Sequence, residues 1–61
     1  MIKKYLQSEI ARLKSQIGAE ESRYFDATKG NQIALELIQI RQNIRELRYE
    51  LDENIEMLSL L

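Results

Sequence analysis

The 61-residue chain has no cysteine, no histidine and no proline, and each absence excludes a class of structure or chemistry. Without cysteine there are no disulfides and no thiolate ligands, and without histidine there is no imidazole for metal binding or acid–base catalysis. We therefore expect no metal and no cofactor. The lack of proline, together with only two glycines, favours helix along nearly the whole chain.

A strong charge bias and long apolar runs are also missing. The formal net charge is −1, which gives no reason to expect an acidic membrane or nucleic acid as a partner. Glu36 interrupts the apolar segment IALELIQI, so no run approaches the length that spans a membrane. The first residues include lysines but no continuous apolar segment follows them, unlike a signal peptide. The expected location is the cytoplasm, without membrane contact.

Two heptad patterns dominate the chain instead, with apolar residues spaced alternately by four and three. The first comprises Leu6, Ile10, Leu13, Ile17, position 20 and Tyr24, and the second Ile33, Leu37, Ile40, Ile44, Leu47, Leu51, position 54, Leu58 and Leu61. Such stripes are typical of the seam of a coiled coil. The phase changes between Tyr24 and Ile33, so the pattern predicts one all-α domain (1–61): a helix at about 2–28, a turn at about 29–31 and a helix at about 32–60.

The turn residues predict an antiparallel two-helix hairpin. Gly30 suits a left-handed position after the first helix, Lys29 suits the negative end of its dipole, and Asn31 can cap the second helix. Facing seam residues then have numbers that add up to about 57, as in Ile17 with Ile40. On this register the second helix extends past the first, which leaves residues 57–61 uncovered.

Two residues interrupt the pattern of the first helix. Glu20 lies on the seam, where a polar residue specifies register or marks a rim. Gly18 lies in mid-helix, at a cost near 1 kcal/mol relative to alanine. It either permits close approach of another chain or is a tolerated surface glycine.

A two-helix seam is a thin core for a chain of this length, which favours self-association. The predicted register places a basic edge (Lys14, Arg41, Arg48) and an acidic edge (Glu9, Glu50, Glu53) on the hairpin. These edges complement each other between two copies, so we expect a homodimer that forms a coiled-coil-like four-helix bundle. The residues expected at the dimer interface are Lys14, Glu9, Glu50, Ile55, Leu58 and Leu61.

Material for catalysis is sparse, because the four serines have no base to activate them. The segment RYELD (Arg48–Asp52) resembles the Ser-x-x-x-Asp segment of the small sporulation aspartyl-phosphate phosphatases, which are helical hairpins of this length. That resemblance implies Asp52 as the catalytic acid and Leu51 as its packing neighbour, with Arg48 in the place of the motif's serine. We do not expect an enzyme.

Arg41, Arg45 and Arg48 follow an i, i+4, i+7 spacing on the second helix, and Arg12 on the first is expected near them. In architecture the arginine stripe resembles the plasmid-encoded RNA-binding hairpin dimers that regulate primer RNA. Phosphate binding needs clustered cations with few opposing charges. Acidic residues lie among these arginines, which favours a solvated or dimer-contacting face over RNA.

The sequence therefore predicts a small self-associating module that binds another protein, as an adaptor, chaperone or inhibitor of the kind that bacteria and phages encode. Off-seam apolar side chains would supply the contacts and the arginines the orientation, because aromatic and arginine anchors concentrate interface energy. The residues expected to bind the partner are Tyr5, Leu35, Ile38, Arg41, Arg45, Arg48, Tyr49 and Met57.

Overall fold

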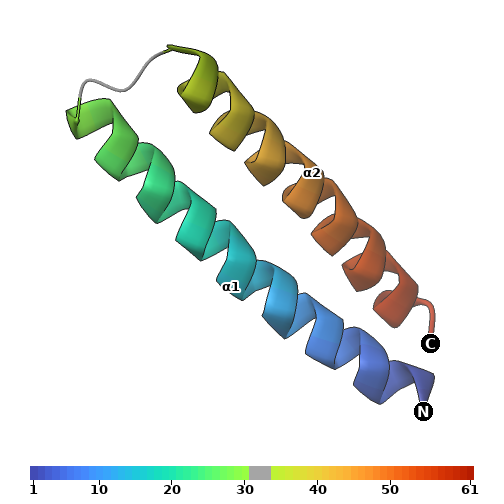
Figure 1. The fold of residues 1–61 in the computed structure, drawn as a ribbon. Coiled ribbons are helices and arrows are strands. Elements are labelled where there is room, and N and C mark those ends of the chain that lie inside the picture. The colour runs from blue at the N-terminus through green and yellow to red at the C-terminus, as the bar shows by residue number, and fades with distance from the viewer. Residues whose placement is uncertain (31–33) are drawn as a thin grey trace.

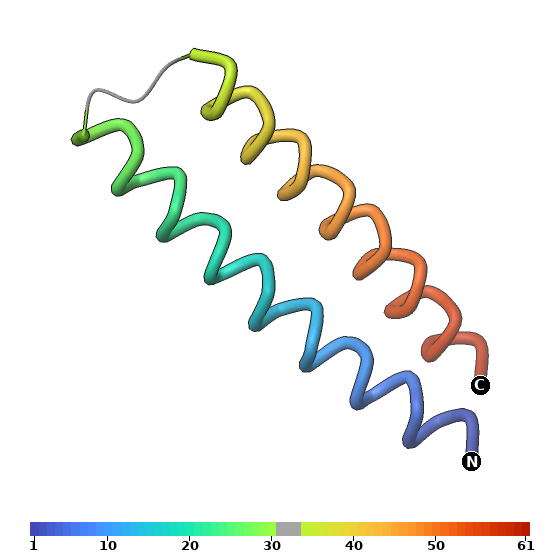
Figure 2. The backbone as a smooth tube through the Cα atoms, in the orientation of Figure 1, coloured from blue at the N-terminus to red at the C-terminus, as the bar shows by residue number. Residues whose placement is uncertain are grey.

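The computed structural model describes residues 1–30 and 34–61, which form two α-helices packed against each other (Figure 1). Helix α1 spans Ile2–Lys29 and helix α2 spans Ala34–Ser59. The helices run antiparallel and side by side along their whole length (Figure 2). The predicted all-α hairpin is confirmed. The predicted cap Asn31 and the seam residue Ile33 lie outside the described residues.

The heptad residues form the contact between the helices, as predicted. Leu13 is 0% exposed, and Leu6, Ile17 and Ile40 are also buried. The half-buried positions of the two heptad stripes are Ile10, Glu20, Tyr24, Leu37, Ile44, Leu47, Leu51, Asn54 and Leu58, and Glu9 and Asn43 beside the seam are half-buried as well. Leu61 was expected on the seam but is 66% exposed, because it lies beyond the end of α2.

Ala27 belongs to the core as well, which the heptad pattern did not indicate. It is only 8% exposed and lies three residues after Tyr24, so it continues the alternation of four and three. Helix α1 reaches Lys29, and its buried stripe therefore extends one position closer to the turn. A single methyl group carries little hydrophobic signal, and for this reason the position does not stand out in the sequence.

The register between the helices differs from the predicted one by about one heptad. Several pairs of residues that border the same surface hollow from opposite helices have numbers that add up to 63, not 57. Examples are Gln16 with Leu47, Glu20 with Asn43, and Ala27 with Glu36.

The ion pair between Glu21 and Arg48 excludes the predicted register. Nη2 of Arg48 lies 2.8 Å from Oε2 of Glu21. On the predicted register Glu21 would face Glu36, which is about 18 Å along the helix axis from Arg48. A heptad pattern cannot distinguish registers that differ by seven residues, so the position of the turn decides between them.

The end of α1 corrects the expectation for Gly30. Its φ is −93°, so the residue is not in the left-handed region. Its N–H donates to the carbonyl oxygen of Asp26 at 3.1 Å, which continues the α-helical hydrogen-bond pattern beyond Lys29. Lys29 does lie in the last turn, where its charge is favourable.

The predicted overhang of residues 57–61 does not occur. Figure 1 shows the two chain ends next to each other at the same end of the hairpin. Leu58 is half-buried, and Leu6, which this register places opposite it, is buried. The shift in register therefore brings α2 back level with α1.

Much apolar surface remains exposed. The solvent-accessible area is 4932 Å², whereas a compact monomer of this mass exposes about 4100 Å². The exposed large hydrophobic residues are Met1, Ile2, Tyr5, Phe25, Leu35, Ile38, Tyr49, Ile55, Met57, Leu60 and Leu61. Over the described residues, neither helix combines the length and apolarity that a membrane span requires.

Candidate functional site

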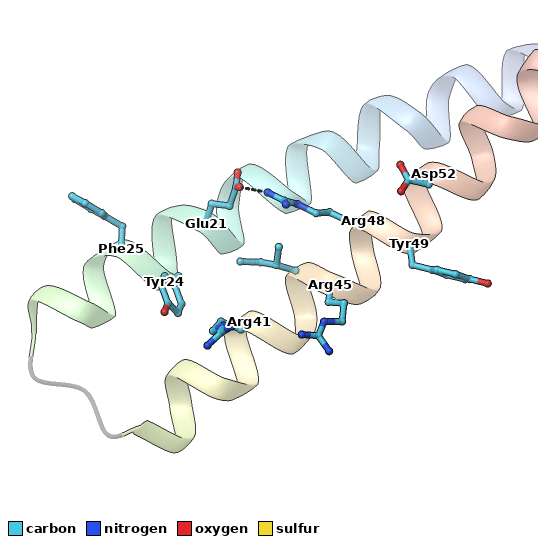
Figure 3. A pocket seen from close by; sticks show the side chains of 9 residues that line it. Glu21, Tyr24, Phe25, Arg41, Arg45, Arg48, Tyr49 and Asp52 are labelled. Carbon is cyan, nitrogen blue, oxygen red and sulfur yellow. Dashed lines mark hydrogen bonds and ion pairs between the residues drawn. The ribbon is translucent and has the colours of Figure 1, made fainter.

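The most distinctive surface is a groove between the helices, on the side of the seam that carries the arginine stripe (Figure 3). We call it the arginine–aromatic groove. It has a volume of about 840 Å³ and is open to solvent. Its lining residues are Glu21, Tyr24 and Phe25 from α1, and Arg41, Ile44, Arg45, Arg48, Tyr49 and Asp52 from α2.

Helical periodicity explains why these side chains meet. On α2 the polar positions Arg41, Arg45, Arg48 and Asp52 recur every three or four residues, so they lie in one row beside the seam. Because facing residues have numbers that add up to 63, this row lies opposite residues 11–22, in the middle of α1. On the predicted register the arginines would have faced an earlier part of α1.

The charges of the groove are only partly paired. Arg48 donates to Glu21, as the dashed line in Figure 3 marks. Both side chains are largely exposed, so this pair contributes at most about 1 kcal/mol to stability. Arg41, Arg45 and Asp52 make no ion pair with any residue in the described part of the chain. The groove therefore offers cations toward the turn and a carboxylate toward the open end.

Three aromatic rings border the groove. Figure 3 shows Tyr24 pointing toward α2, while Phe25 and Tyr49 point outward on either side. Nζ of Lys29 lies 4.3 Å from the centre of the Phe25 ring, a cation–π contact that holds this ring near the turn. Tyr24 is half-buried, whereas Phe25 and Tyr49 are exposed. The groove thus presents apolar area beside charged side chains that have no ion-pair partner among the described residues.

The other side of the seam carries an acidic face, defined by Gln16, Ala19, Glu20, Asn43, Glu46, Leu47 and Glu50. Arg12 belongs to this side. It donates to Glu9 at 2.6 Å and to Gln16 at 3.1 Å. The hydrogen bond from Arg12 lowers the pKa of Glu9, and Glu9, with a smaller contribution from Glu50, raises the pKa of Arg12.

These positions correct the predicted charge edges. Arg12 does not join the arginine stripe, because it lies on the opposite side of the seam. The edge that contains Glu9 and Glu50 is not purely acidic, since Arg12 interacts with both carboxylates. Arg23 pairs with Glu20 at 3.2 Å, on the same helix.

The predicted partner-binding residues do not form one surface. Arg41, Arg45, Arg48 and Tyr49 line the groove, and Ile38 borders Arg41 and Arg45 in a shallow hollow beside it. The remaining three, Tyr5, Leu35 and Met57, are exposed and do not line the groove.

The predicted dimer-interface residues are also dispersed. Lys14 lies two helical turns before Glu21 and therefore on the groove side of α1. Glu9 and Glu50 lie on the acidic side. Ile55 and Leu61 are exposed and Leu58 is half-buried near the open end.

Sequence reasoning missed the α1 side of the groove, because the heptad pattern placed Tyr24 on the seam and the predicted partner-binding residues did not include Phe25. Asp52, which the phosphatase resemblance implies as the catalytic acid, lies exposed at the open end of the groove. Among the described residues, no group of three or more carboxylates is placed to hold a metal ion.

Comparison of the chain with protein-family models, with curated proteins and with solved structures found no match. The function therefore has to be inferred from the surface of the hairpin itself.

Proposed function

We propose that this chain is a non-enzymatic protein-binding module that pairs with a second copy of itself to form an antiparallel four-helix bundle. The observation that carries the proposal is the exposed surface of 4932 Å² on a hairpin with five buried side chains among the described residues. A protein of 61 residues without disulfides commonly completes its core by association.

The amount of exposed surface matches one side of an ordinary interface. The hairpin exposes about 800 Å² more than a compact monomer of its mass. A standard protein interface buries about 800 Å² on each partner. Contact along one long side of the hairpin would therefore bring its surface to the level of a compact protein.

Apolar residues outside the grooves are the candidates for contact with a different protein. Leu35, Tyr5 and Met57 are exposed and lie on neither groove. Large exposed side chains of this kind serve as anchors in interfaces. Such a module would act as an adaptor, chaperone or inhibitor of the protein that it binds.

RNA is a second candidate ligand, favoured by Arg41 and Arg45, which form no ion pair within residues 1–30 and 34–61 and lie beside exposed aromatic rings. Three arginines contact at most about three phosphates. The logarithm of the affinity for single-stranded RNA should therefore fall with the logarithm of the salt concentration with a slope near −2. Glu21 and Asp52 in the same groove oppose such contacts. Affinity for RNA that does not change with salt would remove this candidate.

Sedimentation equilibrium tests the proposal. The monomer has a mass of 7.2 kDa, and we expect a species of about 14 kDa at about 50 µM, because association stabilises the folded form by mass action. Circular dichroism on the same samples reports whether the chain is helical. A helical species that remains at 7.2 kDa at this concentration contradicts the proposal.

A further inference from the structure

We propose that the arginine–aromatic groove is the surface on which the second copy binds, with the groove of one hairpin facing the groove of the other. This inference rests on the proposed self-association and adds its surface and its alignment. The two hairpins would lie antiparallel, with the turn of each beside the open end of the other.

A dimer that does not grow into a larger assembly requires the groove of one copy to face the groove of the other. The arginine–aromatic groove and the acidic face lie on opposite sides of the seam. If the groove of one copy bound the acidic face of the next, each pair would retain one free groove and one free acidic face, and the assembly would grow. Contact between identical surfaces about a two-fold axis closes at two copies.

Four charged residues on the groove side define the alignment. Lys14 and Glu21 are seven residues apart on α1, so they lie on one side of that helix. Arg41 and Asp52 line the groove on α2. Antiparallel pairing brings Lys14 against Glu21 of the other copy, and Arg41 against Asp52 of the other copy. Each contact occurs twice because of the two-fold axis.

The same axis satisfies both kinds of contact. The midpoint between Lys14 and Glu21 falls between residues 17 and 18, and that between Arg41 and Asp52 falls between residues 46 and 47. Facing residues of the hairpin have numbers that add up to 63, so these midpoints are level to within about one residue, or 1.5 Å. The two helices therefore give independent positions for the axis, and these agree.

Gly18 lies at the level of this axis, four residues after Lys14 and three before Glu21. Apart from its chain neighbours and the backbone of its own helix, no atom of the described residues lies within 4 Å of the place that a Cβ at Gly18 would occupy, so the hairpin itself does not need a glycine there. Glycine in mid-helix is less favourable than alanine. A second α1 that crosses at this level would use the missing side chain for close approach.

The alignment also brings Arg45 level with Arg48 of the other copy. Arg48 is bound to Glu21 at 2.8 Å, and the carboxylate of Glu21 offsets the repulsion between the two arginines. Glu21 would then accept from Arg48 of its own chain and from Lys14 of the other copy. A carboxylate has enough acceptor positions for both donors.

A charge exchange at Arg41 and Asp52 tests the alignment, with dimer dissociation constants measured by sedimentation equilibrium at low ionic strength. We expect Arg41→Asp and Asp52→Arg each to weaken the dimer about tenfold, because two contacts become repulsive. The double variant should return to within about threefold of the original constant, since its charges are again opposite. Glu46→Arg on the acidic face, the matched control, should change it by less than about twofold.

Gly18→Ala gives a second reading. We expect unchanged or higher helix content together with a weaker dimer, whereas a merely tolerated surface glycine would leave the dimer constant unchanged.

Two outcomes of the charge exchange would overturn the alignment but leave self-association standing. One is a double variant whose dimer is no tighter than those of the single variants, and the other is equal weakening by Glu46→Arg. An original chain that is monomeric overturns both. Single-stranded RNA binding that Arg41→Asp abolishes, without effect on the dimer, would assign the groove to RNA instead.

Discussion

Replacement of Leu13 by alanine is expected to unfold most of the protein. Leu13 is 0% exposed and lies at the middle of the seam, so the shorter side chain leaves a cavity between the helices. Such substitutions cost about 2–5 kcal/mol. A domain of this length has a total stability of only about 3–9 kcal/mol. The variant should therefore lose most of its helical signal by circular dichroism at 25 °C.

Leu35→Ala is the matched control, because Leu35 is 71% exposed on the other helix. The same change in side chain should alter the free energy of unfolding by less than about 0.5 kcal/mol. Both variants and the original chain should be compared at one protein concentration, since association contributes to stability. Equal loss from the two substitutions would show that Leu13 is not in the core.

Ala27→Leu is expected to destabilise the hairpin by about 1–3 kcal/mol, because a buried alanine has no room for three more carbons. Ala27 borders Ile40 and Glu36 on the register of the structure. On the register predicted from the heptads, position 27 would lie near the end of the first helix and face residue 30 at the turn, where a leucine adds no strain. Urea unfolding followed by circular dichroism measures the difference.

Ala11→Leu is the control for this substitution, since Ala11 is exposed on the same helix. Alanine and leucine have similar helix propensities, so we expect almost no change at position 11. If Ala27→Leu proved as stable as Ala11→Leu, the register of the structure would be wrong.

The fold could be predicted from sequence because the two heptad stripes are long and the phase between them changes once. Each stripe has the period of a helix seam, and the change of phase falls where the turn lies. The burial of Leu13, Ile17 and Ile40 follows from that pattern. The register could not be predicted, since sliding one helix by seven residues pairs apolar positions equally well. Ala27 resolves the ambiguity only after its burial is known.

The groove was only half predictable for the same reason. Arg41, Arg45 and Arg48 share a helix face in any register, so their spacing was sufficient to group them. Their partners on α1 depend on how the helices are aligned, and the predicted alignment placed Glu21 about 18 Å from Arg48 along the helix axis, too far for an ion pair. Arg12 was misassigned although spacing along α1 fixes its side of the seam in either register: it lies three residues after Glu9 and four before Gln16, both on the acidic side.

Thiol cross-linking tests most directly whether a second copy lies over the groove. The chain has no cysteine, so a cysteine introduced at one site reports on that site alone. Lys14→Cys mixed with Glu21→Cys should give abundant mixed dimers with a short bifunctional thiol reagent. Gln16→Cys mixed with Ala19→Cys, at the same level on the acidic side, should give few. Preferential cross-linking of the second pair would contradict groove-to-groove pairing.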